Sequence, residues 1–276
     1  EIIDTPGMYS LLPITEEERV ARRILLNESP DLVIHVVDAR NLERMLTMTL
    51  QLIESGLPVI LAVNIMDEAD RLGIVIDIPL LRDKLGIPIL GAAFAKKRGL
   101  SEIRGMISKY KRDTPMLYRY SNRLENDIEG IGKLLRETYG ISTKATALLL
   151  LQRDEEIADL VKTTEGDVYA TVDATVRDKA YAWRGSFHLE LSLERQRMAE
   201  KILKEVFKTP DTKKTTASDK VSRLLVKPLT GIPLLFIVLY FGLYQFVGVL
   251  GAGTIVDFLE KKLFEGYFNP WITGIV

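Results

Sequence analysis

The chain opens with Glu-Ile-Ile-Asp-Thr-Pro-Gly (residues 1–7), and a later apolar run, 58–63, leads into Asn-Ile-Met-Asp (64–67). Each motif directly follows apolar, β-branched residues, so each should lie where a strand ends. An aspartate before a Pro-Gly turn, followed by NxxD, is typical of the second half of a guanine-nucleotide site. The first half, a GxxxxGK[ST] phosphate loop, does not occur in the sequence. We therefore expect a GTPase segment without its N-terminal part.

Around these motifs, residues 1–112 alternate between strand and helix patterns. Short apolar runs predict buried parallel strands at 32–37, 58–63 and 87–90. Helical patterns lie between and after them at 16–26, 42–54, 78–85 and 101–110. The alternation predicts a doubly wound α/β sheet of GTPase type, incomplete at its N-terminus, with ligands at the carboxyl ends of the strands.

Residues 113–210 predict a small, mainly helical domain. Apolar residues recur there at helical spacing in 128–139, 145–151, 157–161 and 189–206. A strand signal occurs at 168–172, and the pattern of 163–188 as a whole is not readable.

The C-terminal part predicts a membrane helix. No charged residue occurs between Lys227 and Asp257, and Gln245 is the strongly polar residue within 232–250. About 20 apolar residues cross a bilayer core, whereas a buried core helix, the alternative, is usually shorter and amphipathic. The basic linker 211–228 should keep its side cytoplasmic. We expect 229–276 to start a membrane domain, with a span at about 232–250 and then an interfacial helix.

Composition excludes several classes of function. The net charge of −1 carries no signal for nucleic acid, and the absence of cysteine excludes disulfides and thiolate metal sites. His35 lies within an apolar run and is expected to be a satisfied core histidine. The sequence contains no His, Cys or Glu cluster that suggests an iron site.

In the first motif, the Asp4 carboxylate is the expected magnesium ligand, through water, as in phosphate-loop enzymes. Gly7 lets the backbone approach the terminal phosphate, and Thr5 and Pro6 complete the turn. An ordinary Pro-Gly turn capped by aspartate is the alternative. Met8 cannot orient a water molecule, so the catalytic group for hydrolysis is unknown and enzyme activity stays open.

In the second motif, the Asp67 carboxylate can accept two hydrogen bonds from guanine, for which adenine has no matching donors. Asn64 would hold the loop, with Met66 between the two. Ile65 replaces the usual lysine, which predicts weaker binding and faster release. Ala93 is the expected donor of a backbone N–H to the guanine carbonyl. Asp38, at the end of its strand, is expected to cap a turn.

Several stretches resemble bacterial ferrous-iron transport protein B (FeoB). They are DTPGMYSLLP (4–13), EEERVAR (16–22), VVDARNLERML (36–46), LPVILAVNIMDEA (57–69), SDKV (218–221) and KPLTGIP (227–233). The resemblance is weak through 113–210. It implies a fragment that lacks the phosphate loop and most of the membrane domain, and it places Tyr9–Glu18 in the mobile second switch.

The resemblance also implies a function for the parent protein: GTPase-coupled uptake of ferrous iron across the bacterial inner membrane, with the GTPase and helical domains cytoplasmic. The helical domain would restrain nucleotide release and pass changes to the membrane. Its cofactors would be GTP or GDP, magnesium and, in the intact parent, potassium. Membrane lipid is an expected partner, and a small cytoplasmic accessory protein and a homo-oligomer stay open.

Two other interpretations stay open. The chain can belong to a membrane-anchored regulatory GTPase that does not transport iron, or it can be an inactive remnant. Since most phosphate contacts are missing, we expect these residues alone to bind guanine nucleotide poorly and to be inactive.

Overall fold

The computed structural model describes residues 1–28, 30–111, 118–208 and 224–269. It divides into two compact units, 1–211 and 212–276. Each unit is treated by itself below.

The first unit is built around a parallel sheet with strand order β1–β2–β4, formed by β1 (Val33–Asp38), β2 (Val59–Asn64) and β4 (Ile89–Gly91). Its register pairs Val33 with Val59 and Leu61 with Ile89, so Asp38 and Asn64 end side by side. All three predicted strands are confirmed, with shifts of one or two residues.

The helices around this sheet are α1 (Glu16–Asn27), α2 (Leu42–Glu54), α3 (Met66–Arg71), α4 (Ile78–Leu85) and α5 (Leu100–Ser108), with single turns η1 (Ala39–Asn41) and η2 (Phe94–Lys96). Four of these helices, α1, α2, α4 and α5, follow the sequence prediction, whereas α3 was not predicted. A first hydrophobic core lies between the sheet, α2 and α4, and β2 is buried along 59–63. On the other face, Ile103 of α5 packs with Ile60 and Ala62.

The predicted strand at Ile2 and Ile3 does not form. Residues 1–8 are irregular, and the Ile2 side chain is 98% exposed. So short a run offers too few ladder hydrogen bonds to offset the entropy of ordering it. Regular structure begins at α1, where Thr15 and Glu18 form a reciprocal capping box.

The helical part of this unit comprises α6 (Asn122–Gly132), α7 (Thr143–Leu151), α8 (Glu155–Glu165), η3 (Gly166–Val168), α9 (Tyr169–Ala182) and α10 (Phe187–Val206). They enclose a second core. The strand signal at 168–172 is wrong: Val172, Val176 and Ala180 are buried at a helical spacing of four. The predicted helix 128–139 begins earlier and ends at Gly132, while the Tyr139 hydroxyl donates to the Glu165 carboxylate.

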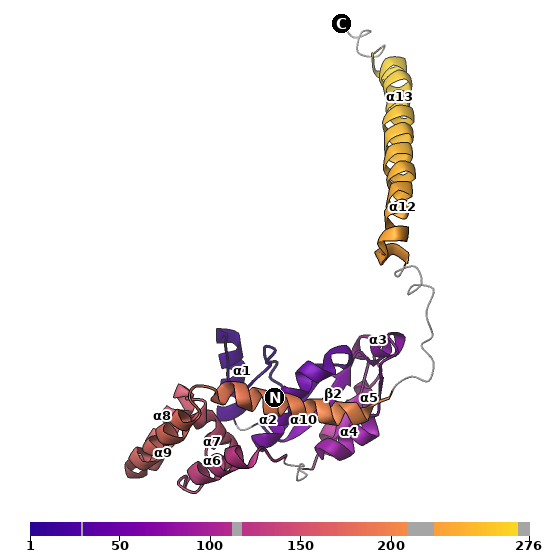
Figure 1. Cartoon of the computed structure of the whole chain (residues 1–276). Helices are drawn as coiled ribbons and strands as arrows, with labels where there is room; N and C mark the ends of the chain where they lie inside the picture. The colour runs from indigo at the N-terminus through magenta and orange to yellow at the C-terminus, as the bar shows by residue number, and fades with distance from the viewer. Residues whose placement is uncertain (29, 112–117, 209–223, 270–276) are drawn as a thin grey trace. The chain divides into compact units, whose positions relative to one another are not determined.

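Helix α10 extends from the second core to the first (Figure 1). It ends in β5 (Phe207–Lys208), which pairs antiparallel with β3 (Val75–Ile76). The last turns of α10 therefore pack in the core around the sheet, although the sequence places them in the helical segment 113–210.

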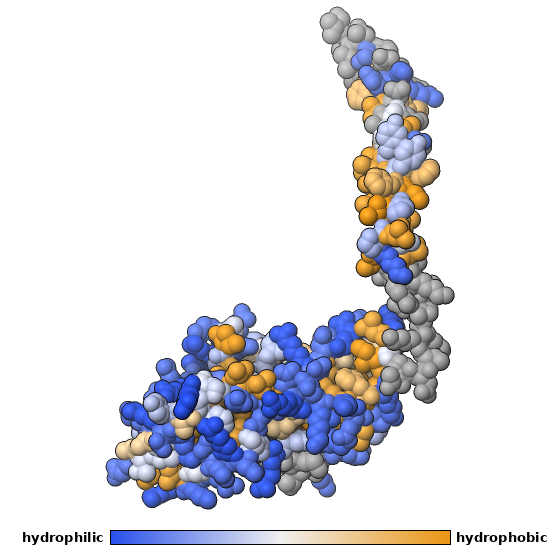
Figure 2. All heavy atoms as spheres, viewed as in Figure 1, coloured by the Kyte–Doolittle hydropathy of each residue, from blue (hydrophilic) through white to orange (hydrophobic). Residues whose placement is uncertain are grey.

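The second unit contains a long helix. Its consecutive segments are α12 (Pro228–Val238), η4 (Leu239–Ile255), α13 (Val256–Phe258) and η5 (Leu259–Phe268). Pro228–Val249 is long and apolar enough to cross a membrane, with mean hydropathy 2.0 and no part buried. Figure 2 shows apolar side chains along this helix. The predicted interfacial helix is not a separate element, because helix continues from the span through residue 269; Trp271 lies outside the described residues.

A buried ion pair joins α1 to the helical part. The Nη1 and Nη2 groups of Arg22 each donate to the Asp154 carboxylate at 2.6 Å, and both side chains are at most 4% exposed. Asp154 also accepts from the Ile157 N–H and so caps α8. The Arg22 Nε has no partner. The pair fixes α1 to α8 at the cost of desolvating two charges.

Arg22→Ala should lower the free energy of unfolding by about 3–5 kcal/mol, because it leaves Asp154 buried without its counter-charge. The matched control is Arg23→Ala, which breaks an exposed pair with Glu156 and should cost no more than about 1 kcal/mol. Urea unfolding of the chain in mild detergent measures both. Equal losses in the two variants would refute the structural role of the buried pair.

His35 is half-buried on β1 and its ring has a partner, Thr49, as expected of a satisfied histidine. Its Nδ1 lies 3.1 Å from the Thr49 Oγ1, and burial lowers the pKa of His35 from 6.5 to about 4. The folded protein therefore holds His35 neutral at a pH where the unfolded chain binds a proton. Stability contributed by this group is present above pH 6.5 and is lost as the pH falls toward 4.

His35→Gln should flatten this acid dependence while keeping a side chain that can hydrogen-bond Thr49. We expect the variant to lose less stability than the unmodified chain between pH 7 and pH 4.5, measured by urea unfolding at each pH. His188→Gln, at an exposed position on α10, is the control and should retain the full loss. The same loss in both variants would contradict the assignment.

Candidate functional site

The carboxyl ends of β2 and β4 bring the second motif and the loop after β4 together. The Asn64 Oδ1 accepts the Phe94 N–H at 3.0 Å, and the Met66 N–H donates to the Ala92 carbonyl at 3.0 Å. These two bonds tie the loops on neighbouring strands to each other. Asn64 therefore holds a loop, as the sequence predicted.

Asp67 stands in the first turn of α3, with its carboxylate partly exposed beside this loop. The Lys96 ammonium lies 2.5 Å from the Asp67 Oδ2 and, by this hydrogen bond, lowers the pKa of Asp67 below its usual value. The carboxylate is thus charged and open to solvent at neutral pH, which is the state needed to accept two N–H groups from a ligand.

Sequence reasoning placed Lys96 in the expected base-contacting loop, 91–96, but did not predict its ion pair with Asp67. The signal was available, since a cation in the loop after β4 must lie at the same sheet edge as the motif after β2. Lys96 contributes a cation from another loop, whereas Ile65 occupies the position where a lysine usually follows the asparagine.

The backbone between Asn64 and α3 is strained. Ile65 has φ of 64° in the left-handed region, which a β-branched residue rarely adopts. Such a conformation costs about 1–2 kcal/mol, and strain of this kind concentrates at functional sites.

The expected role of Ala93 needs correction. Its N–H donates to the Arg98 carbonyl at 3.1 Å, and Ala93 is only 2% exposed. The amide is therefore committed to the bridge that closes this loop and is not free to meet a base. Ala93 shapes the loop that Asn64 holds.

Asp38 caps a turn, as predicted. Its carboxylate accepts the Arg40 N–H at 2.8 Å and pairs with the Arg40 guanidinium, which lowers the pKa of Asp38. Arg40 also pairs with Glu68 of α3 and so links the ends of β1 and β2.

The first motif is not brought to this corner. Asp4, Thr5, Pro6 and Gly7 are exposed, and they make no recorded hydrogen bond or ion pair within the part of the chain that the structure describes. A Cβ built at Gly7 would meet nothing within 4 Å, so no close backbone approach forms there.

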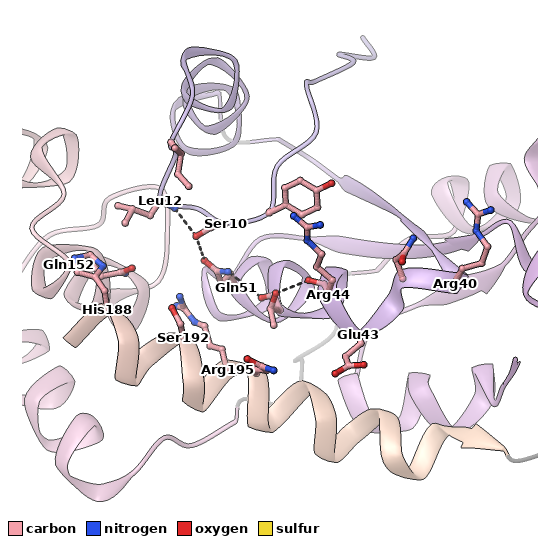
Figure 3. Close-up of a pocket in the computed structure, with 15 residues that line it drawn as sticks. Ser10, Leu12, Arg40, Glu43, Arg44, Gln51, Gln152, His188, Ser192 and Arg195 are labelled. Carbon is pink, nitrogen blue, oxygen red and sulfur yellow. Dashed lines mark hydrogen bonds between the residues drawn. The ribbon is translucent and has the colours of Figure 1, made fainter. Parts of the chain in front are cut away.

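The segment after Gly7 is fastened to α2 by one buried side chain (Figure 3). The Gln51 Oε1 accepts both the Ser10 hydroxyl, at 3.2 Å, and the Leu11 N–H, at 3.1 Å. The Arg44 guanidinium lies 4.4 Å from the centre of the Tyr9 ring. This segment, α2 and α10 line a cavity of about 690 Å³.

Among the described residues, no group of three or more His, Cys, Asp or Glu side chains could hold a metal ion. Asp4 offers a single carboxylate for magnesium. The corner at Asn64 and Asp67 presents one partly exposed carboxylate, that of Asp67, and residues 4–7 form no metal site within the described part of the chain.

Comparisons with known proteins agree with this fold. The family model described as ferrous iron transport protein B matches residues 1–107, and the model of the FeoB cytosolic helical domain matches residues 120–208. The Fe(2+) transporter FeoB of Escherichia coli K12 is 29% identical over 306 aligned residues, covering 99% of this chain and 37% of that protein.

Two further proteins are informative. An Fe(2+) transport protein A/FeoB fusion protein of Porphyromonas gingivalis is 31% identical, covering 100% of this chain and 33% of its own length. This chain thus spans about a third of the relatives that it matches. The crystal structure of NFeoB from S. thermophilus bound to GDP, AlF4⁻ and K⁺ is 28% identical with a TM-score of 0.63, covering 73% of this chain and 79% of that one.

The two family models follow one another along the sheet and helical parts, and both describe the same protein. The chain therefore belongs to the family of ferrous iron transport protein B, FeoB.

Proposed function

We propose that this chain is the GTP-binding cytoplasmic part and first membrane helix of a ferrous-iron transporter of the bacterial inner membrane. The observation that carries the proposal is the corner at the carboxyl ends of β2 and β4. There Asn64 ties the two loops together, and Asp67 presents a charged, solvent-facing carboxylate. The names of the relatives supply the transported ion, Fe(2+).

Guanine recognition follows from the chemistry of Asp67. A carboxylate accepts two hydrogen bonds from the ring N–H and the exocyclic amine of guanine, while Lys96 can move from the carboxylate toward solvent. Adenine offers no such donor pair and would leave the desolvated carboxylate unpaired, which costs about 1–3 kcal/mol. Met66 lies between Asn64 and Asp67 in the sequence, and its N–H donates to the Ala92 carbonyl.

The phosphate side of the site is proposed from sequence. The Asp4 carboxylate would hold magnesium through water, and the backbone of 5–7 would meet the terminal phosphate, once this exposed segment is ordered by nucleotide. The potassium in the S. thermophilus complex makes potassium a candidate cofactor. Among these residues, the Asp4 carboxylate is the one group that would hold magnesium.

The proposed domain boundaries are 1–112 for the GTPase part, 113–210 for the helical part, 211–228 for the linker and 229–276 for the start of the membrane domain. The helix Pro228–Val249 supports membrane insertion. The fusion of transport protein A to the P. gingivalis relative supports a small accessory protein as partner. No observation favours a regulatory GTPase that transports nothing.

Asp67→Asn should exchange guanine for xanthine as the preferred base. The asparagine amide can donate to the carbonyl that replaces the exocyclic amine in xanthine, whereas it pairs poorly with guanine. We expect GDP affinity to fall at least tenfold and xanthosine diphosphate affinity to rise, measured by equilibrium dialysis at millimolar nucleotide. In the complete transporter that carries this segment, the variant should also lower iron uptake.

Asp70→Asn is the matched control, because Asp70 is exposed on the same short helix, α3. It should leave both affinities unchanged. If GDP binding is equal in the unmodified chain and in Asp67→Asn, the proposed base site is wrong.

A further inference from the structure

Helix α10 has two sets of packing partners. Near its start, Phe187 and Leu191 are buried in the second core. Near its end, four buried side chains belong to the first core, around the sheet: Ala199, Ile202, Leu203 and Val206. Figure 1 shows α10 extending past α2 to α4. The last turns of α10 therefore follow the sheet domain, whatever the helical part does.

The end of α10 is fastened to the segment between α3 and α4. Strand β5 pairs with β3, with Phe207 opposite Ile76 and Lys208 opposite Val75. The Asp77 N–H donates to the Val206 carbonyl at 3.0 Å, and the Asp77 carboxylate lies 2.8 Å from the Lys208 ammonium. One residue before Val206, Glu205 of α10 pairs with Lys84 of α4.

This fastened segment is also in contact with the base corner. Gly91 ends β4 close to two side chains: a Cβ there would lie 3.3 Å from the Ile78 Cγ1, a tight contact, and 3.6 Å from the Met66 Cγ, an ordinary contact. Ile78 opens α4 next to Asp77, and Met66 opens α3 within the base motif. Close-packed contacts of this kind pass displacements on and do not absorb them.

We infer that the β3–β5 pair, with the Asp77–Lys208 ion pair, is the tie through which the guanine site acts on the chain that leads to the membrane helix. The route runs from Met66 through Gly91 and Ile78 to Asp77, and from there to Val206 and Lys208. The chain then continues through 209–223 to the apolar helix. The inference rests on the proposed function for its ligand.

This route differs from a relay through the helical part, which the order of domains suggests. It needs no movement in the second core, because every contact lies between the sheet domain and the last turns of α10. Since coupling between two sites is reciprocal, loosening β5 must change nucleotide affinity by the same factor by which nucleotide changes the order of β5.

The first test needs no nucleotide. Asn64→Ala frees the Phe94 N–H and loosens the base corner, so amide hydrogen exchange at 206–208 should accelerate several-fold, while exchange at Leu191 stays the same. Asn41→Ala is the matched control, since Asn41 also follows a strand end and donates to Asp38, outside the proposed route. Unchanged exchange at 206–208 in Asn64→Ala would overturn the tie.

The second test uses GDP with the full chain. Phe207→Ala removes a side chain that packs on the first core, and Lys208→Gln removes the ion pair with Asp77. Each should weaken GDP affinity about fivefold, the lower end of typical coupling. Lys204→Gln, exposed on α10, should not. Normal GDP affinity in both β5 variants would refute the coupling.

The two tests separate the tie from the proposed function. If GDP produces no protection at 64–67 in the unmodified chain, the guanine site is refuted, and with it the role of the tie in nucleotide signalling. The Asn64→Ala experiment still decides whether the base corner and β5 are mechanically linked.

Discussion

The parallel pairing of β2 with β4 is the constraint on which the site depends. Because both strands end at the same edge, the loop after each lies within reach of one asparagine side chain, and the Asn64 Oδ1 closes the gap by accepting the Phe94 N–H. The same two loops carry the other residues of the corner. Asp67 pairs with Lys96, and Ile65 adopts a left-handed backbone conformation. The Asn64–Phe94 and Met66–Ala92 hydrogen bonds hold the two loops of the corner together.

The same strand ends connect the site to the rest of the molecule. Ile78 and Met66 both pack close to Gly91, and the Asp77 N–H donates to the Val206 carbonyl at the end of α10. At the other end, the Arg22–Asp154 pair fixes α1, which follows the 9–14 segment, to the helical part. The two motifs are thus connected to different parts of the molecule. The first is followed by α1, which pairs with the helical part through Arg22 and Asp154. The second packs near α4, whose preceding residue Asp77 bonds to Val206 just before β5.

Local patterns were enough to predict the sheet and most helices. The strands at 32–37, 58–63 and 87–90 and the helices at 42–54 and 78–85 read directly from apolar runs and period. The failures have physical causes. Valines at 168 and 172 suggested a strand, but the burial of 172, 176 and 180 follows a helix. Ile2 and Ile3 form too short an apolar run to pair as a strand. Pairing between distant residues, such as Ile76 with Phe207 and Lys96 with Asp67, leaves no local pattern.

The central claim is that the Asn64–Phe94 corner reads guanine. Amide chemical shifts of Met66 and Phe94, recorded while GDP or ADP is added to the chain at millimolar concentration, test it most directly. The account predicts that GDP shifts both amides in a saturable way and that ADP leaves them in place, because only guanine offers donors to Asp67. Equal shifts with the two nucleotides, or none with GDP, would contradict it.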